Sequence, residues 1–578
     1  MLLAQLTRAF IPLALLGFAV WLSRSVQRIV GRFLLRKFTA VGDLDRVGRP
    51  RMSGPIHGTA VVCGGSFSGL FTARVCASHF EKVIVVEPEA FTFTDEAVNG
   101  EPLATRHVDD HTNGPYQTIA HKRTRVYQYL SVHLYQVILT RFLRAVFPTF
   151  DASAKQVGAR FTANDAFIHI GGRRVLFPHK SVETSADYAN QGMFIARRTL
   201  ETLVRRLVIA TCANVSFING TVTDFVLKED SSAVSSVVVR TADGSSTELP
   251  CELVADCTGN TQAGYKILKR VVPGLSLQRD EYNPKFYLVS MEFPSPPNFD
   301  EDLAKLGIPG ISTLEEAKAA PFFHLGGPDA ELDYKHVVAG RVDGRIVIAA
   351  GGYDSELPTT LDGVREYASG VLGSAGVTNP VPDYYYAILD LLEPVAEKGT
   401  VFLGRCIACS RIYYEAAADK LPHNYVAVGD SSLRLNPRAG EGVTKVSVGA
   451  LTLDGVLRDS HPADKDFGAT FFKRMESRTG HLWLASKLSD YGMPTTIPVK
   501  GESLDSGKFV FNAINRLNAV MCRDDSKFWR GDAATAKAFW GTMQFMRPPT
   551  DLFTPGTLGR LACEFAWAAW NSNDSGKQ

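Results

Sequence analysis

A glycine-rich turn between two short apolar runs constrains the fold of this chain more than any other feature. The first run covers residues 59–63, the second covers 82–86, and the sequence GGSFSG at 64–69 opens a helix-forming stretch between them. Glycine at the first and last positions permits a tight turn and close packing of the helix on the strand, and the helix N-terminus presents free N–H groups to a pyrophosphate. An acid eighteen residues beyond the last glycine is placed to accept hydrogen bonds from a ribose. The pattern predicts a strand–turn–helix–strand unit that binds a dinucleotide through Gly64, Gly65, Ser66, Ser68, Gly69 and Glu87, with Ser66 replacing the usual middle glycine.

Two further patterns combine an apolar strand with a turn. The run at 425–428 leads into Gly429 and Asp430, with a proline seven residues after the aspartate and glycines ten and twelve residues after it. Residues 253–259 read Leu-Val-Ala-Asp-Cys-Thr-Gly, so that a second apolar run ends in an acid and a glycine. Arg197 precedes Leu200 and Leu203 on a predicted helix, and by itself it is also compatible with a surface cation.

Together these motifs resemble the p-hydroxybenzoate-hydroxylase-like flavoproteins, over roughly residues 58–460. The resemblance is closest to the polyether-type FAD epoxidases and their fungal relatives, and squalene epoxidase is more distant. Those epoxidases carry a V-P-Q…H segment, which residues 125–128 and His133 match with tyrosine in place of proline, and a G-G…D…P-[PT] segment, which residues 351–359 match. The D-x-[ST]-G strand end at 256–259 also occurs in halogenases and geranylgeranyl reductases.

The resemblance implies FAD as the cofactor. In that family the aspartate of the Gly-Asp motif binds the ribityl hydroxyls, an arginine matching Arg197 contacts the flavin side of the cofactor, and the helix that follows points its positive N-terminus at the isoalloxazine ring. NADPH is the expected electron donor, directly or through a partner reductase, because no second nucleotide-binding unit is evident. The cofactor-binding residues implied beyond the first motif are Arg125, Arg197, Asp256, Gly259, Gly429, Asp430, Pro437, Gly440 and Gly442.

The implied reaction is monooxygenation of a lipophilic alkene or a terpenoid- or polyketide-type compound in secondary metabolism, by epoxidation through a flavin C4a-hydroperoxide. The cofactor supplies this reactivity, whereas the protein orients the substrate and excludes water. No catalytic residue is assigned, and His133 is interpreted as structural. A flavin-dependent ene reductase of the geranylgeranyl-reductase type, a flavin halogenase, and a pseudoenzyme or lipid-binding module are the alternatives. Glu441 opposes the main interpretation, because its charge near reduced flavin is unfavourable unless Lys445 offsets it.

We predict an α/β chain in which a Rossmann-like FAD-binding domain is interleaved with a β-sheet substrate domain. Residues 337–349 alternate on both sides of Asp343-Gly344, as in a hairpin, and 286–293 read as another strand. The motifs at both ends of the chain mean that the domains are not sequential. The predicted segments are a membrane helix at 1–38, a linker at 39–57, FAD-binding parts at 58–275 and 401–460, the substrate domain at 276–400 and a helical region at 461–578.

The N-terminus predicts a membrane anchor. Residues 9–22 are uncharged, which is marginal for a span of about 20 residues. Arginines then recur every four residues from 24 to 36 beside an apolar face, as in helices that lie on anionic lipid. Positive charge after the run predicts a catalytic body in the cytosol, on the endoplasmic reticulum membrane. A cleaved signal peptide and a helix packed on the enzyme are the alternatives, and the aromatic residues near Trp567 are a candidate second membrane contact.

Composition excludes some classes of function. Charged residues make up 21% of the chain and the net charge is +2, which argues against a nucleic-acid partner. The nine cysteines form no dense framework, so a reducing compartment is expected, and the pair Cys406 and Cys409 is interpreted as incidental. The expected partners are therefore a lipophilic small molecule, the membrane and a reductase.

Overall fold

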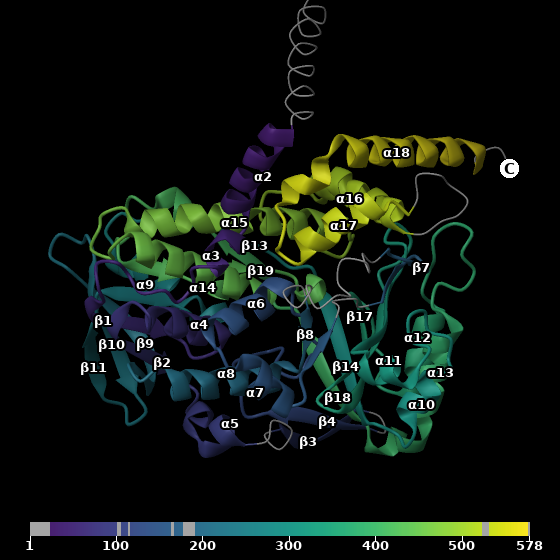
Figure 1. The fold of residues 1–578 in the computed structure, drawn as a ribbon, viewed down its shortest axis with the longest axis horizontal. Coiled ribbons are helices and arrows are strands. Elements are labelled where there is room, and N and C mark those ends of the chain that lie inside the picture. The colour runs from purple at the N-terminus through teal and green to yellow at the C-terminus, as the bar shows by residue number, and fades with distance from the viewer. Residues whose placement is uncertain are drawn as a thin grey trace, which may run out of the picture.

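The computed structural model describes residues 24–100, 106–113, 116–162, 167–176, 191–522 and 531–575. Two large β-sheets organise these residues, and each has a hydrophobic core of its own. The sheet built around the glycine-rich turn occupies the left half of Figure 1, and the sheet of the predicted substrate domain occupies the right half.

The first sheet has seven strands and the order β11-β10-β9-β2-β1-β12-β20. Its parallel centre is the predicted unit, with β1 (Ile56–Cys63) beside β2 (Phe80–Glu87) and β12 (Leu253–Asp256). These strands are almost continuously apolar because helices cover a parallel sheet on both faces. The remaining strands are β9 (Val215–Leu227), β10 (Val234–Thr241), β11 (Ser246–Pro250) and β20 (Tyr425–Ala427).

Two helices begin where strands of this sheet end. Helix α4 (Phe67–Cys76) follows β1, and α14 (Gly442–Asp459) follows the Gly-Asp motif after β20. The two helices pack on each other. Strands β1, β12 and β20 are parallel, so their carboxyl ends meet at one edge of the sheet. The three motifs after these strands therefore lie together although they are far apart in the sequence.

The second sheet has nine strands and the order β3-β4-β18-β14-β17-β16-β15-β6-β7. The predicted hairpin is confirmed: β16 (His336–Val342) and β17 (Arg345–Tyr353) pair antiparallel, with positive φ angles of 50° at Asp343 and 71° at Gly344 in the turn. Strands from both predicted FAD-binding parts also enter this sheet. The other strands are β3 (Arg106–Asn113), β4 (Tyr116–His121), β6 (Ile168–Ile170), β7 (Arg173–Arg174), β14 (Phe286–Pro294), β15 (Phe322–Gly327) and β18 (Thr400–Arg405).

Helix α8 (Arg197–Thr211) is tied to the second sheet by a buried ion cluster at its first turn. Arg198 contacts Glu292 of β14 at 2.7 Å and Asp343 of the hairpin turn at 3.0 Å, and Thr199 donates to the same aspartate at 2.7 Å. Buried charges are tolerated when they are paired and hydrogen-bonded in this way. One face of α8 is buried with the first sheet's core, through Leu200 and Leu203 among others, so this helix joins the two halves of the molecule.

The described part of the C-terminal region is mainly helical. Helix α15 (Phe467–Asp490) packs on α14 along the top of the molecule, and α16 (Lys508–Met521), α17 (Ala533–Met543) and α18 (Pro555–Ser575) lie beside it (Figure 1). A small sheet of β13 (Arg279–Tyr282), β19 (Cys409–Ile412) and β21 (Leu433–Arg434) contacts α15, where Tyr282 donates to Asp490 at 2.8 Å.

The structure corrects the prediction of a membrane-anchored protein at the endoplasmic reticulum. Across the helices of the described ranges, none has both the length and the apolar character needed to cross a bilayer. Helix α2 (Arg24–Phe38) has only 15 residues and repeats arginine every fourth position, whereas a span needs about 20 mainly apolar residues. The predicted apolar run at 9–22 lies outside the described residues.

Candidate cofactor and substrate cavity

One cavity of ≈ 380 Å³ is lined by residues of both large sheets and of the loops that join them. This volume lies within the range of small-molecule sites. The cavity runs from the glycine-rich turn after β1 to the apolar surface of the second sheet. Of the fifteen predicted cofactor-binding residues, twelve line it: Gly64, Gly65, Ser66, Ser68, Glu87, Arg125, Arg197, Gly259, Asp430, Pro437, Gly440 and Gly442.

The three remaining residues, Gly69, Gly429 and Asp256, do not line the cavity but support the residues that do. A Cβ atom on Gly69 would lie 1.7 Å from the carbonyl oxygen of Gly64, so only glycine lets α4 approach the strand. A Cβ on Gly429 would lie 2.3 Å from Ser68 Oγ. Asp256 is fully buried and its carboxylate accepts hydrogen bonds from Thr258, Ser431, Gly264 and Tyr425, so it joins the turns after β12 and β20 rather than facing the cavity.

Ser66 explains the departure from the usual three-glycine pattern. Its hydroxyl donates to Glu201 Oε2 at 2.8 Å, and Arg197 Nη2 lies 3.4 Å from the same hydroxyl. The side chain therefore bonds to α8 and does not cap α4. The first N–H groups of α4 are left without a side-chain cap at the cavity, where an anion can accept from them.

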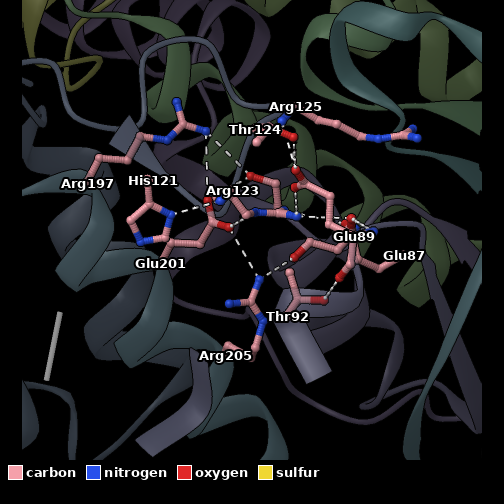
Figure 2. Close-up of polar contacts among 12 residues, drawn as sticks. Glu87, Glu89, Thr92, His121, Arg123, Thr124, Arg125, Arg197, Glu201 and Arg205 are labelled. Atoms are coloured by element: carbon pink, nitrogen blue, oxygen red, sulfur yellow. Dashed lines mark hydrogen bonds and ion pairs between the residues drawn. The ribbon is translucent and has the colours of Figure 1, made fainter. Parts of the chain in front are cut away.

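Figure 2 shows a buried ion cluster, centred on Arg123, beneath this turn. The guanidinium contacts Glu89 at 2.5 Å, Glu201 at 2.9 Å and Glu87 at 3.0 Å, and its side chain is only 2% exposed. Arg205 Nη2 lies 3.3 Å from Glu201 and also donates to the carbonyl oxygen of Gly65 at 3.0 Å. With Arg197 the cluster contains three cations and three carboxylates, so its formal charge is balanced.

Glu87, the predicted ribose acceptor, is part of this cluster. Its Oε2 accepts from the N–H of Gly65 at 2.7 Å, and its Oε1 accepts from the N–H of Glu89 at 3.0 Å. Arg123 donates to both oxygens, at 3.0 and 3.4 Å. Since a carboxylate has about four acceptor positions, a ribose hydroxyl would have to share the oxygen that makes the 3.4 Å contact.

The electrostatics of the cluster keep Glu201 ionised. Burial acts to raise the pKa of Glu201, but Arg123, Arg205 and Arg197 lower it to about 2. Burial likewise acts to lower the pKa of Arg123, and the three glutamates raise it instead. Sequence reasoning missed Arg123, Glu89, Glu201 and Arg205, although Arg123 lies two positions before Arg125 and Glu201 lies one helical turn after Arg197.

Asp430, the predicted ribityl-binding residue, faces the cavity with its side chain 41% exposed. Lys445, which is buried in α14, donates to Asp430 Oδ1 at 2.8 Å and to the carbonyl oxygen of Leu433. The lysine therefore pairs with Asp430, and its charge also acts on Glu441, as the sequence had suggested. Among the described residues, no side chain or backbone donor reaches the second carboxylate oxygen of Asp430.

Burial moderates the unfavourable charge of Glu441. Burial raises the pKa of this carboxyl group to about 7, against the opposing effects of Lys445 and Arg438. Glu441 is also the N-cap of α14 but makes no side-chain cap, so a second uncapped helix N-terminus meets the cavity at Gly442 and Val443.

His133 and Arg197 lie together on the cavity wall. Burial and the nearby Arg197 lower the pKa of His133 to about 3, and its Nδ1 bonds to the carbonyl oxygen of Ser131 at 2.8 Å. The ring is therefore neutral, in keeping with a structural role. Arg197 Nε is buried and has no hydrogen-bond partner among the described residues, which leaves one donor for a bound molecule.

The far end of the cavity is mainly apolar. Burial and the nearby Arg438 lower the pKa of His336 to about 3, so this ring is also neutral. Cys406 lines the cavity as well, as a free thiol, while Cys409 is buried behind it. The apolar lining at this end consists of Phe286, Leu288, Phe322, Leu325, Val338 and Ala350.

The C-terminal region contributes a buried aspartate beside this end. Asp490, at the end of α15, accepts from Tyr353 at 2.6 Å and from Tyr282 at 2.8 Å. Asn436, which precedes Pro437 in the Gly-Asp motif, donates to both of its oxygens at 3.1 and 3.2 Å. This network joins the helical region to the cofactor motif and to β17, and nothing in the sequence indicated it.

These residues fit a dinucleotide such as FAD. Two uncapped helix N-termini and the unpartnered Arg197 Nε offer donors to negatively charged groups. Asp430 offers an acceptor oxygen to hydroxyl groups. A Cβ on Gly64, where φ is +119°, would lie 2.3 Å from the carbonyl oxygen of Cys257, so this turn depends on glycine.

Comparison with solved structures identifies the fold. The chain resembles a flavoprotein/dehydrogenase from Cytophaga hutchinsonii with a TM-score of 0.50 at 10% identity, covering 90% of this chain and 100% of that one. PqsL, a probable FAD-dependent monooxygenase from Pseudomonas aeruginosa, gives 0.49 at 14% identity, with 79% and 100% covered. CmlS, a flavin-dependent halogenase, gives 0.49 at 14% identity, with 84% and 78% covered. No protein-family model and no curated protein sequence matches.

At these identities the likeness shows the fold alone. The chain has the fold of the Cytophaga hutchinsonii flavoprotein/dehydrogenase, which confirms the predicted α/β class. The expectation of an FAD-dependent oxidoreductase agrees with this fold, whereas the closeness to epoxidases remains a prediction from the sequence motifs.

The Arg123 cluster predicts a large stability loss when its central cation is removed. Arg123→Met would leave Glu87, Glu89 and Glu201 facing one another in a buried site, and breaking a buried pair in this way costs about 3–5 kcal/mol. Urea unfolding measures the change. Lys122→Met, which breaks only an exposed pair with Glu96, is the matched control and should cost about 1 kcal/mol or less. Equal losses of unfolding free energy in the two variants would contradict the stabilising role of Arg123.

The raised pKa of Glu441 predicts a pH-dependent stability. The folded chain holds the Glu441 proton more tightly than the unfolded chain, whose ordinary pKa is 4.5, so the associated stability is present below pH 4.5 and lost as the pH rises through about 7. Glu441→Gln should therefore match the native protein near pH 4.5 and unfold at a higher temperature above pH 7. Scanning calorimetry across this range measures it. The exposed Glu229→Gln is the control, and parallel pH profiles of native and Glu441→Gln proteins would refute the assignment.

Proposed function

We propose that this chain is an FAD-dependent monooxygenase that acts on a lipophilic organic substrate. The observation that carries the proposal is the continuity of one cavity from the glycine-rich turn and the Gly-Asp motif to an apolar wall of the second sheet. A cofactor held by the first part would meet a substrate held by the second. Reduced FAD supplies the reaction with dioxygen when it is bound.

The chain's own residues would bind and orient the cofactor and the substrate, and they would exclude water. The N-terminus of α4 and the turn at Gly65 would receive the pyrophosphate, and Asp430 would accept from the ribityl hydroxyls. The N-terminus of α14 would face the flavin ring and stabilise negative charge on it. The apolar side chains of β14, β15 and β16 would hold the substrate in a dry environment, where a reactive intermediate decays slowly.

Epoxidation of an alkene is the specific reaction that we propose, on the basis of the sequence motifs shared with FAD epoxidases. Both histidines on the cavity wall are neutral, and we assign no acid–base residue to the reaction. NADPH or a partner reductase would supply the electrons. An ene reductase and a halogenase are the competing reactions on the same fold, and product analysis distinguishes them.

The role of Asp430 can be separated from its effect on folding. Asp430→Ala should raise the dissociation constant for FAD about tenfold or more through the loss of charged hydrogen bonds, but it also leaves Lys445 buried without its partner. The double variant Asp430→Ala/Lys445→Met removes both charges and should recover stability without recovering FAD. Flavin absorbance after gel filtration measures occupancy, and thermal unfolding measures stability. Full FAD occupancy in the double variant would exclude Asp430 as a cofactor ligand.

The reaction itself is tested with labelled dioxygen. With NADPH or a reductase and a panel of prenylated and polyene compounds, the FAD-loaded enzyme should insert one oxygen-18 atom per product molecule, detected by mass spectrometry. A product heavier by two hydrogens and formed equally well without dioxygen would establish an ene reductase. A product that contains bromine or chlorine, formed only when the corresponding halide is supplied, would establish a halogenase.

A further inference from the structure

Arg438 is a cation at the boundary between the cofactor motif and the apolar end of the cavity. It belongs to the short helix η8 (Pro437–Ala439), directly after Asn436. Its side chain is exposed, and the residue lines the cavity. The resemblance to flavoproteins did not single out this position, and the cofactor-binding residues predicted around it are Pro437 and Gly440.

The guanidinium is supported by residues of α15 and β17, and the backbone of Arg438 is supported by Asn436. Arg438 Nη2 donates to Ser489 Oγ of α15 at 2.9 Å, and the guanidinium lies 5.9 Å from the centre of the Tyr353 ring of β17. The backbone N–H of Arg438 donates to Asn436 Oδ1 at 3.1 Å, and Asn436 in turn is bonded to Asp490. Such a supported side chain loses little conformational freedom when it binds a ligand.

The nearby acids do not neutralise Arg438 by direct pairing. Asp490 uses both carboxylate oxygens for Tyr353, Tyr282 and Asn436. Within the part of the chain that the structure describes, no carboxylate forms an ion pair with Arg438. Arginine has five N–H donors, of which Ser489 accepts one. Most of the fork-shaped donor set therefore remains for a ligand.

Apolar and neutral side chains line the cavity around Arg438, while interaction with Tyr353, Asp490, Tyr282 and Glu441 raises the pKa of its guanidinium. Phe286 and Leu288 line the same end of the cavity, and the His336 ring on that wall is uncharged. A substrate that fills this end removes water from the guanidinium, and an unpaired charge in such a site is costly. A planar anion on the substrate relieves this cost, because a carboxylate matches the guanidinium fork with two parallel hydrogen bonds.

We propose that Arg438 is an anion-binding subsite and that the substrate is a lipophilic carboxylic acid, whose carboxylate pairs with Arg438 while its apolar body lies on the second sheet. This inference deepens the proposed function and rests on it for the identity of the substrate as the molecule that is oxidised. The binding step itself requires only the cavity and Arg438.

The test is a comparison of matched acids and alcohols. Isothermal titration calorimetry on the FAD-loaded protein is carried out with decanoic acid and decanol, cinnamic acid and cinnamyl alcohol, and farnesoic acid and farnesol. At least one acid should bind about tenfold or more tightly than its alcohol, as expected for hydrogen bonds to a charged group. Arg438→Met should reduce the affinity for that acid to the level of the alcohol and leave the alcohol unchanged. Arg438→Lys, which keeps the charge without the fork, should restore part of the preference.

Matched controls make each outcome decisive. Arg516→Met removes an arginine from the surface of α16, where it pairs with Glu331, and should leave every affinity unchanged. The inference is overturned if no acid binds more tightly than its alcohol, or if Arg438→Met weakens acid and alcohol alike. It is also overturned if the variant changes only the dissociation constant for FAD, since Arg438 would then serve the cofactor. Failure of oxygen insertion with the acid preference intact would instead refute the proposed reaction.

Discussion

The buried contact between Arg123 and three glutamates is the interaction on which the rest of the structure depends. Glu87 is the last residue of β2, Glu89 follows it, Glu201 lies on α8, and Ser66 of the glycine-rich turn bonds to the same Glu201. Burying several charges is favourable only when all are paired and hydrogen-bonded, so the parts of the chain that supply them must meet in one arrangement. The cluster thereby fixes the turn relative to α8, whose first turn is tied to the second sheet.

A cavity with two different walls follows from this arrangement. The wall at the first sheet presents helix N-termini, backbone N–H groups and Asp430, whereas the wall at the second sheet presents mainly apolar side chains. Asp490 stabilises the junction, because its contacts with Asn436 and Tyr353 hold the Gly-Asp loop against β17. The helical region after residue 460, which had no recognisable motif, is therefore part of the support of the site.

Local spacing in the sequence did not reveal several charged contacts, because their partners are set by the fold. Lys445 lies one helical turn after Glu441 and its charge acts on that residue, as the spacing indicates, but its hydrogen bond to Asp430 across the loop was not foreseen. Asp256 ends an apolar strand like a cofactor-binding acid but turns inward to Thr258 and Ser431. The membrane prediction also failed: α2 is too short and too basic to span a bilayer, and the apolar run before it lies outside the described residues.

The sequence by itself determined the local elements that depend on near neighbours. The glycine-rich turn, the strands on either side of it, the Asp343-Gly344 hairpin and the helix after the Gly-Asp motif follow from spacing, because turn geometry and helix starts are set within a few residues. Only the tertiary structure decided the pairing of Arg123 with Glu201, 78 residues away, and of Asn436 with Asp490, 54 residues away. The energy of a buried charge depends on which groups surround it, and those groups come from distant segments that only folding brings together.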